Sequence, residues 1–287
     1  KIWTEQGSPL LKISQDQADA LRHALNEKYP DSFEVVLAMR YGNPSVADGL
    51  EALRARGVRR VLVFPLYPQY SASTVASTFD AVTSELHNWR WVPELRFINH
   101  YHDHEKYIDA LASSIQTYWQ SHGQPEKLLM SFHGVPRDYL EKGDPYHCEC
   151  HKTGRLLAEK LGLNETQWQL SFQSRLGPKE WLKPYTDQTL EALGKEGVKS
   201  VHVVCPGFSA DCLETLEEIA MENRDVFLEA GGQNYEYIPC LNADSSHVDM
   251  MLSLVEQHTG GWDLNTNMEQ LKEEAEQRNQ AYKKLNG

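Results

Sequence analysis

An apolar run, a Pro-Gly turn and a helix start follow one another in the stretch Val203-Val204-Cys205-Pro206-Gly207-Phe208-Ser209-Ala210-Asp211-Cys212-Leu213-Glu214-Thr215-Leu216-Glu217-Glu218. The helical pattern continues to about residue 228. Glu214, Glu218 and Glu222 are spaced four residues apart and therefore share one face of an α-helix. This order predicts a buried strand that feeds directly into a helix with an acidic face.

Two interpretations of this acidic face stay open. Exposed acidic helices are common, so the three carboxylates could be a solvated surface. They could instead form a track for a divalent cation. The second interpretation is favoured by position, because Glu214 follows the carboxyl end of a strand, where open α/β sheets place their sites.

The rest of the chain repeats the alternation of strands and helices. This pattern predicts an α/β fold with parallel sheets flanked by helices. The strand-like runs are Phe33–Met39, Val58–Leu66, Glu94–Asn99, Leu128–His133, Gln167–Gln173, Ser200–Cys205 and Tyr235–Cys240. The helical patterns are Gln15–Lys28, Val46–Ala55, Thr74–Leu86, Tyr107–Gln120, Thr153–Leu161, Asp187–Gly194, Leu213–Val226, Ser246–His258 and Met268–Lys284.

An internal repeat predicts two similar halves. Leu-Glu-Ala-Leu followed by Gly-Val and further valines begins at Leu50 and again at Leu190, a constant offset of 140 residues. Chance agreement between two generic α/β units is the alternative. We expect two similar α/β halves at residues 1–122 and 123–245 with a ligand cleft between them, and C-terminal helices at 246–287 that pack on the first half.

The bulk composition excludes several classes of protein. The formal net charge is −13 and no segment concentrates Lys and Arg, which argues against a nucleic-acid-binding protein. No apolar run approaches 18 residues, so no transmembrane helix is expected. Five cysteines spread over 287 residues fit reduced thiols of a cytosolic protein better than a disulfide framework.

His133 is the first candidate for chemistry. It ends an apolar run and is followed by Gly134, so it should project from a strand end as a proton acceptor or metal ligand. The alternative is a histidine that caps a turn. Because parallel strands bring their carboxyl ends together, His133 and Glu214 are expected to meet. One histidine with carboxylates, without thiolates, suits Fe²⁺ or another borderline ion rather than structural zinc.

Other strand ends carry arginines and aromatic side chains. Phe172-Gln173-Ser174-Arg175 precedes Trp181, and Arg40-Tyr41 follows the predicted strand at residues 33–39. Such residues could hold a flat ligand with acidic arms, or they could be ordinary core and surface residues. Cys148 and Cys150, with Cys205 and Cys212, could ligate zinc or a [2Fe–2S] cluster, or remain free thiols.

Several motifs in a fixed order resemble one family. They are Ser131-Phe132-His133-Gly134-Val135-Pro136, Gly143-Asp144-Pro145-Tyr146, Phe172-Gln173-Ser174-Arg175 with Trp181, and Pro206-Gly207-Phe208 through Glu214-Thr215-Leu216. The sequence is similar to bacterial ferrochelatases, lyases that insert Fe²⁺ into protoporphyrin IX and form protohaem at the end of haem biosynthesis. The resemblance implies two Rossmann-like domains with the porphyrin cleft between them.

The resemblance also implies roles for particular residues. His133 and Glu214 would be the catalytic pair and would contact the metal, while Glu218 and Glu222 would extend the metal path. The porphyrin-binding residues would be Arg40, Tyr41, Tyr70, Gln173, Ser174 and Trp181. No cofactor is expected beside the Fe²⁺ substrate. An animal-type [2Fe–2S] cluster is not expected, because Ala72 stands at its internal cysteine position and no cysteine follows Cys240.

Some alternatives remain open at this point. The ring could be another tetrapyrrole such as coproporphyrin, or the protein could carry porphyrin or haem without catalysis. The resemblance implies a cytoplasmic location. It leaves open peripheral contact with the inner membrane and the choice between a monomer and a homodimer.

The start of the sequence departs from the family pattern. Members normally begin with a strand that ends in an Asn-Leu-Gly-Thr-Pro-like turn, whereas this sequence begins near the family's Trp-x-x-x-Gly-Ser-Pro stretch, Trp3 to Pro9. A chain lacking that strand would have an exposed sheet edge and an incomplete pocket. We therefore expect these 287 residues alone to have little chelatase activity. Turnover near that of a full-length relative would contradict this expectation.

Overall fold

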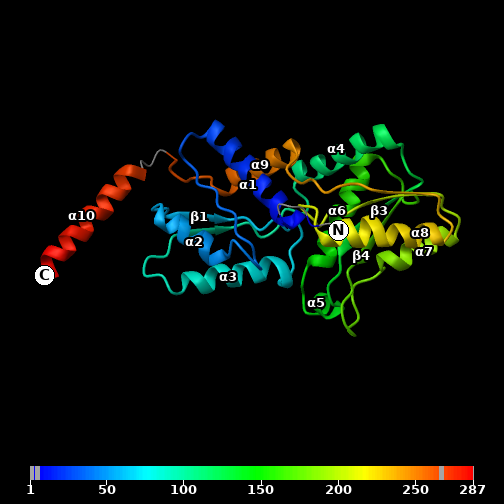
Figure 1. Cartoon of the computed structure of the whole chain (residues 1–287), viewed down its shortest axis with the longest axis horizontal. Coiled ribbons are helices and arrows are strands. Elements are labelled where there is room, and N and C mark those ends of the chain that lie inside the picture. The colour runs from blue at the N-terminus through cyan, green and yellow to red at the C-terminus, as the bar shows by residue number, and fades with distance from the viewer. Residues whose placement is uncertain (1–2, 4–6, 265–267, 287) are drawn as a thin grey trace. The chain divides into compact units, whose positions relative to one another are not determined.

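The structure, a computed structural model, describes residue 3, residues 7–264 and residues 268–286 (Figure 1). The chain divides into two compact units. Unit 1 takes in the described residues up to Gln17, together with Pro65–Ala76 and Asn99–Met250. Unit 2 takes in Ala18–Phe64, Ser77–Ile98 and the described residues from Met251 onward. Part of the predicted Trp3–Pro9 motif, residues 4–6, lies outside the described residues.

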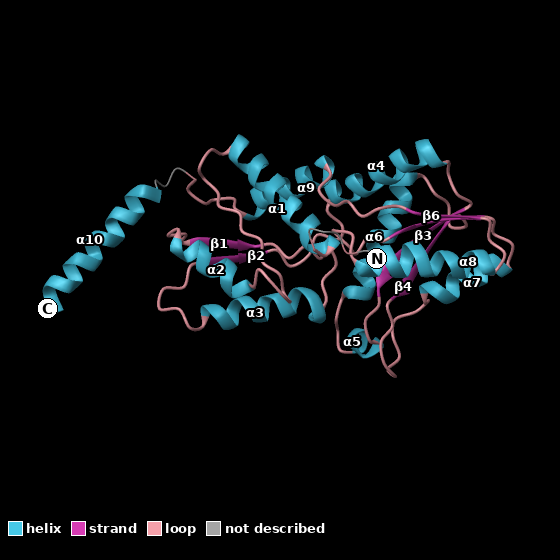
Figure 2. Ribbon diagram, in the orientation of Figure 1, coloured by secondary structure: helices cyan, strands magenta, loops and turns pink. Residues whose placement is uncertain are grey.

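Unit 1 is built on a four-stranded parallel sheet (Figure 2). Its strands are β3 (Lys127–His133), β4 (Trp168–Gln173), β5 (Ser200–Val204) and β6 (Asn234–Tyr237), in the order β4-β3-β5-β6. The predicted parallel sheet is confirmed. Its register places His133 opposite Gln173, so the carboxyl ends of β3 and β4 lie together.

Helices cover both faces of this sheet. On one face, Gly154 of α6 (Tyr146–Leu161) lies against Met130. On the other, Leu129 belongs to a buried cluster that also contains Leu190 of α7 (Thr186–Lys195) and Phe227 of α8 (Asn223–Glu229). Leu129 and Met130 are consecutive in β3, and consecutive strand residues point to opposite faces. The predicted layering of helices on both sides is therefore confirmed.

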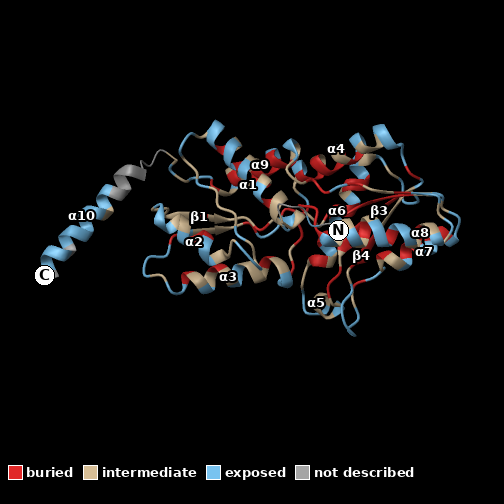
Figure 3. Cartoon of the chain, in the orientation of Figure 1, coloured by how far each residue is buried: buried red, intermediate tan, exposed pale blue. Residues whose placement is uncertain are grey.

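The centre of this sheet explains the apolar character of its strands. Leu129, Met130 and Phe132 of β3 have no exposed surface, and the middle of β3 is coloured as buried in Figure 3. Parallel strands covered on both faces need apolar residues at successive positions rather than at alternate ones. Burying each of these side chains stabilises the fold by about 1.5–3 kcal/mol as an upper estimate.

Unit 2 holds a smaller parallel pair, β1 (Arg60–Val63) and β2 (Glu94–Phe97). Its apolar cluster joins Leu50 of α2 (Val46–Ala55) to Val82 of α3 (Ser77–Leu86). A capping box fixes the start of α2, because Ser45 and Asp48 exchange hydrogen bonds between their side chains and backbone amides. Local sequence and apolar packing thus define the same helix.

The remaining helices lie before, between and after these strands along the chain. They are α1 (Pro9–Lys28), α4 (Glu105–His122), α5 (Arg137–Glu141), α9 (Ser245–His258) and α10 (Met268–Asn286), with π-helices η1 (Ala72–Ala76) and η2 (Glu214–Glu222). Most described side chains of α10 are exposed. Across the part of the chain that the structure describes, no helix is both long and apolar enough to cross a membrane.

The predicted repeat corresponds to equivalent elements. Helix α2 begins at Val46 and α7 at Thr186, while β1 begins at Arg60 and β5 at Ser200, each pair 140 residues apart. Both helices lead through a glycine turn into a parallel strand. The domain boundaries near residues 122 and 245 stay a prediction.

Three local predictions were wrong. Residues 33–38 form no strand, and Met39 makes only one bridge, to Ser45, since a strand needs a partner for its backbone groups. The short helix α5 was missed. Residues 214–222 were predicted as α-helix but form the π-helix η2, whose i→i+5 bonds no local propensity signals.

Acid is expected to destabilise the fold through His202 on β5. Burial lowers the pKa of His202 to about 4, and its Nδ1 has no hydrogen-bond partner. The folded pKa lies below that of an unfolded histidine, so unfolding takes up a proton between these values and stability falls as the pH drops. The loss should reach about 2 kcal/mol between pH 7.5 and pH 5. Urea unfolding at both pH values should show a smaller loss in His202→Asn, and an equal loss would contradict this assignment.

Candidate functional site

His133 lies at the end of β3, and its hydrogen bond defines the tautomer of the neutral imidazole. Its Nδ1 lies 2.6 Å from the carbonyl oxygen of Gly134. A carbonyl can only accept a hydrogen bond, so Nδ1 donates and Nε2 of the neutral ring carries the lone pair. The hydroxyl of Tyr146 donates to the carbonyl of His133 over 2.8 Å and fixes the strand end. This arrangement leaves Nε2 as a base or metal ligand.

Gln173 joins His133 to the start of η2. It lies opposite His133 in the register of β3 and β4, and its Nε2 donates to the carbonyl oxygen of Glu214 over 3.0 Å. Its Oε1 accepts from the Ser131 hydroxyl over 2.7 Å. Because the Gln173 side chain is buried and bonded at both ends, it holds the strand ends and η2 in a fixed relation.

Glu218 and Ser174 are brought together in the same unit. The Ser174 amide donates to Oε1 of Glu218 over 2.8 Å, and the Ser174 hydroxyl donates to Oε2. Ser174 adopts a φ of 64°, a left-handed conformation that serine rarely takes. The two hydrogen bonds to Glu218 help hold this conformation. Such strained backbone conformations are typical of functional sites. Glu222, one helical turn further along, is exposed.

The thiol of Cys212 lies near Glu214 at the entry to η2. Burial and, to a smaller degree, the neighbouring carboxylate of Glu214 together raise the pKa of Cys212 to about 12. Cys212 is therefore a neutral thiol at physiological pH.

Trp181 packs over the loop that follows β3. Its indole Nε1 donates to the carbonyl of Leu176 over 3.0 Å, and its backbone forms an antiparallel bridge with Pro136. A Cβ atom at position 134 would lie 3.1 Å from Cε3 of Trp181 and 2.9 Å from the carbonyl oxygen of Gln173. Gly134 thus permits the close approach of three candidate-site segments.

Gly134→Ala is expected to destabilise unit 1 by about 1–3 kcal/mol, because the added methyl must push backbone atoms apart. Urea unfolding measures this change. Gly260→Ala is the matched control, since its Cβ would lie 3.4 Å from the nearest atom, and it should stay within about 0.5 kcal/mol. Equal free energies of unfolding for the two variants would contradict the packing argument.

The Gly143-Asp144-Pro145-Tyr146 motif anchors the segment that carries Tyr70. The carboxylate of Asp144 accepts from the amide of Ala72 over 2.7 Å and from the hydroxyl of Ser71 over 3.1 Å. Oε2 of Glu149 accepts from the amide of Tyr70 over 2.7 Å. These carboxylates hold residues 70–72 at the start of η1, although the sequence alone gave Asp144 and Glu149 no role.

Arg40 and Tyr41 belong to unit 2. The guanidinium Nε of Arg40 donates to the backbone carbonyl and hydroxyl of Ser77, over 2.9 and 2.8 Å. The same guanidinium stacks on the ring of Tyr41 at 4.5 Å, and that ring is 73% exposed. Within unit 2 the pair therefore offers a fixed cation beside an exposed aromatic surface.

The cysteines are not arranged as cluster ligands. Cys148 is exposed, while Cys150, Cys205, Cys212 and Cys240 are buried, and all five are free thiols. Among the described residues, just one group of three histidine, cysteine or acidic side chains could share a metal ion, and it contains no cysteine. The residues present therefore do not fit an iron–sulfur cluster.

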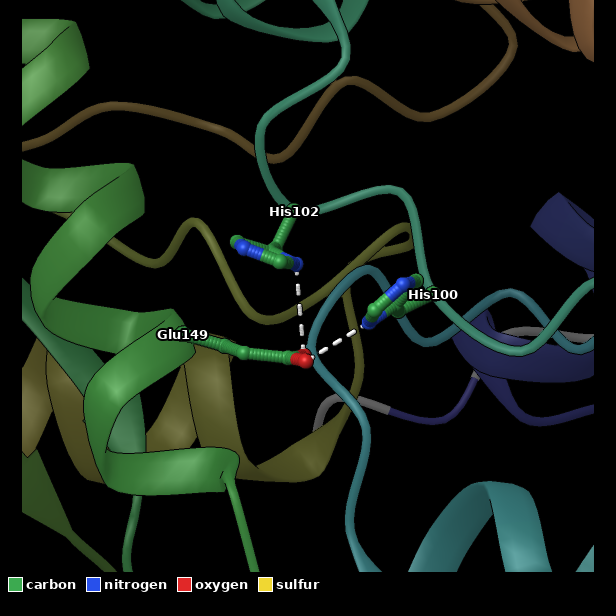
Figure 4. A group of neighbouring side chains, drawn as sticks. All are labelled: His100, His102 and Glu149. Carbon is green, nitrogen blue, oxygen red and sulfur yellow. Dashed lines mark hydrogen bonds and ion pairs between the residues drawn. The ribbon is translucent and has the colours of Figure 1, made fainter.

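That group was not predicted from the sequence. It consists of His100, His102 and Glu149, whose potential ligand atoms all lie within 4.8 Å of one another (Figure 4). The two histidines come from the segment between β2 and α4, and Glu149 comes from α6. The spacing His-x-His was the available signal, but nothing local connected it to a glutamate 47 residues away (from 102 to 149).

A family model named Ferrochelatase matches residues 1–259 of the sequence. The chain belongs to the ferrochelatase family. A ferrochelatase of Marinobacter nauticus is 55% identical over 284 residues, which cover 98% of this chain and 77% of the relative. One of Thioalkalivibrio sulfidiphilus is 58% identical over 262 residues, covering 91% of this chain and 71% of the relative.

Solved chelatase structures share the fold of this chain. SirB from Bacillus subtilis, solved with Fe³⁺, has a TM-score of 0.59 at 14% identity and covers 90% of this chain and 96% of its own. CbiX, described as the terminal enzyme of sirohaem biosynthesis in denitrifying bacteria, has a TM-score of 0.54 at 12% identity and covers 86% and 89%. At these identities the similarity concerns the fold alone, and it confirms the predicted chelatase-like α/β architecture.

Proposed function

We propose that the chain is a protoporphyrin ferrochelatase, a lyase that inserts Fe²⁺ into protoporphyrin IX to form protohaem in the last step of haem biosynthesis. Membership of the family across residues 1–259 supports this function. The structural observation that carries it is Gln173, which lies opposite His133 in the sheet and hydrogen-bonds the backbone of Glu214. The buried Gln173 side chain thus connects the strand end that carries His133 to the helix η2 that carries the glutamates.

Metal insertion into a porphyrin requires both a base and carboxylate ligands. Two pyrrole protons must leave the ring as the metal enters, and a flat ring shields its central nitrogens. Binding contacts remote from the centre can hold the ring in a bent shape that exposes the nitrogen lone pairs. Nε2 of His133 carries a lone pair and accepts one pyrrole proton, and the second proton passes to the carboxylates of η2 and from there to water.

The carboxylates of η2 bind the incoming Fe²⁺ in this proposal. Glu222 is exposed, while Glu218 and Glu214 are half-buried, so the series leads from solvent towards the strand ends. Carboxylate oxygens can replace water around incoming Fe²⁺ and keep its charge compensated. Ser174 holds Glu218 in place with two hydrogen bonds, which gives this step a fixed geometry.

The porphyrin contacts fall in both units. In unit 1, Trp181 and Tyr70 supply aromatic surface and Ser174 supplies a polar group, while the buried Gln173 supports the site through its hydrogen bonds to Ser131 and Glu214. In unit 2, Arg40 suits a propionate carboxylate and Tyr41 an apolar part of the ring. We assign porphyrin binding to the side chains of Trp181, Tyr70, Ser174, Arg40 and Tyr41.

We place the reaction in the cytoplasm and assign it no resident cofactor. The five free thiols are typical of a reducing compartment. The reaction exchanges protons for Fe²⁺ without changing an oxidation state, so porphyrin and Fe²⁺ are sufficient reactants.

A metal-insertion assay tests the function. The natural protein that carries this sequence should convert protoporphyrin IX and Fe²⁺ to protohaem, followed by the loss of porphyrin fluorescence and the gain of haem absorbance. Protoporphyrin IX should be a better substrate than coproporphyrin III in kcat/KM. Preference for coproporphyrin III would overturn the substrate assignment. Tight porphyrin binding without insertion would overturn the enzymatic function and indicate a carrier.

A further inference from the structure

A second constellation with ligand chemistry lies within unit 1, apart from the residues assigned to the reaction. We call His100, His102 and Glu149 the His100 cluster. Figure 4 shows both imidazoles directed at the single carboxylate of Glu149. His100 Nδ1 lies 2.6 Å from Oε1, and His102 Nδ1 lies 3.3 Å from Oε2. Each carboxylate oxygen therefore faces one histidine nitrogen.

Two of the three side chains in the His100 cluster are buried. The side chains of His102 and Glu149 are 7% and 8% exposed, whereas that of His100 is 50% exposed. The buried Nδ1 of His102 makes no hydrogen bond of acceptable geometry in the structure. Its contact with Oε2 of Glu149 is an ion-pair distance of 3.3 Å without hydrogen-bond geometry, and a metal ion between the two atoms would satisfy both. The exposed His100 gives that ion a route from solvent.

The geometry points to a binding site for one divalent transition-metal ion, held by His100, His102 and Glu149. Two imidazoles and one carboxylate, with no thiolate, are typical of Fe²⁺, Co²⁺ and Zn²⁺ sites that keep open positions. Ca²⁺ and Mg²⁺ prefer sets made entirely of oxygen ligands. The donor set thus defines the class of metal, and that class includes the proposed Fe²⁺ substrate.

The distances agree with a shared ion. Two ligands that bind one metal at about 2.1 Å with tetrahedral angles lie about 3.4 Å apart. His102 Nδ1 and Glu149 Oε2, at 3.3 Å, already have this separation. The shorter contact of His100 to Oε1 must open by roughly 0.8 Å, and an exposed imidazole can rotate at little cost. One side-chain adjustment would complete three ligands.

Surrounding groups orient the proposed ligands. His102 Nε2 lies 3.9 Å from Oδ2 of Asp103, and that carboxylate pairs with Lys152 over 2.6 Å. Histidines that bind metals commonly direct their other nitrogen towards a carboxylate. Oε2 of Glu149 also accepts from the amide of Tyr70. A bound ion would thereby be linked through Glu149 to the segment that carries Tyr70, a proposed porphyrin-binding residue.

The test is Co²⁺ binding to the natural protein that carries this sequence, in a His133→Ala background that removes the proposed catalytic metal ligand. Calorimetry with Co²⁺ alone should detect one site, and anomalous diffraction from Co²⁺-soaked crystals should place a peak between His100, His102 and Glu149. His100→Ala and Glu149→Gln should each weaken this site at least 10-fold. His87→Ala is the matched control, since His87 is exposed and lies in unit 2.

Two outcomes would overturn the proposal. One is the absence of an anomalous peak at the His100 cluster at 1 mM Co²⁺ (about the upper limit for a specific site). The other is equal Co²⁺ affinity in the parent, His100→Ala and His87→Ala proteins. Far-ultraviolet circular dichroism checks folding. If Glu149→Gln does not fold, His100→Ala decides the matter, because an exposed side chain can be removed at little structural cost.

Discussion

His133→Ala is expected to lower the rate of Fe²⁺ insertion into protoporphyrin IX by about 10²–10⁴-fold, the range typical of a lost general base. His133 is the last residue of β3, and its Nδ1 donates to Gly134, so Nε2 is the nitrogen that accepts a proton. Alanine removes this nitrogen and keeps the strand backbone. The measurement is the initial rate of protohaem formation in the natural protein that carries this sequence.

A binding measurement separates a chemical role from a structural one. Porphyrin affinity of His133→Ala, measured by fluorescence quenching, should change no more than a few-fold, because the proposed porphyrin contacts lie on other residues. His87→Ala, the loss of an exposed histidine, should retain the parent rate. Comparable rates in the parent and His133→Ala would remove His133 from the mechanism. A parallel loss of binding and rate would assign it a structural role instead.

The regular elements of this fold could be predicted because their signals are local. Helix α2 begins and ends as predicted, since Ser45 and Asp48 cap it and Leu50 faces the core. Strand β3 was found from its apolar run, which parallel packing between two helix layers requires. Both features depend on neighbours within a few residues.

The secondary-structure predictions that were wrong concern segments whose conformation depends on partners distant in sequence. The segment at residues 33–38 has the apolar pattern of a strand, but no strand pairs with it among the described residues. The π-helix at η2 was also missed. Its neighbourhood includes the hydrogen bonds from Gln173 to Glu214 and from Ser174 to Glu218, which come from another strand end. Propensity within a window contains no such information.

The candidate site also combines features that the sequence predicts with features that only the folded structure brings together. The rule that parallel strands end at one edge predicted that His133 and Glu214 would meet, and Gln173, which lies opposite His133, hydrogen-bonds the backbone of Glu214. The meeting of the His133 and Glu214 side chains stays a prediction. The His100 cluster could not be predicted in this way. His102 lies in a connection and Glu149 in a helix, so only the folded structure brings them together.

Glu214→Gln is expected to lower the insertion rate by about 10²-fold or more, since it removes a charge but keeps the size of the side chain. Glu214 is half-buried at the start of η2, and its backbone carbonyl accepts from Gln173. That backbone bond survives the substitution, so the change isolates the carboxylate. Fe²⁺ insertion into protoporphyrin IX measures the effect.

The matched control for this variant lies three residues along the same helix. Glu217 is exposed, belongs to η2 and carries the same charge, so Glu217→Gln lowers the net negative charge equally. If general attraction of Fe²⁺ to an acidic surface were the cause, both variants would lose activity to the same degree, and the loss would diminish with salt. We expect instead that Glu217→Gln retains the parent rate within about twofold at all ionic strengths, whereas Glu214→Gln stays impaired at high salt, because a half-buried ligand acts by direct contact with the metal.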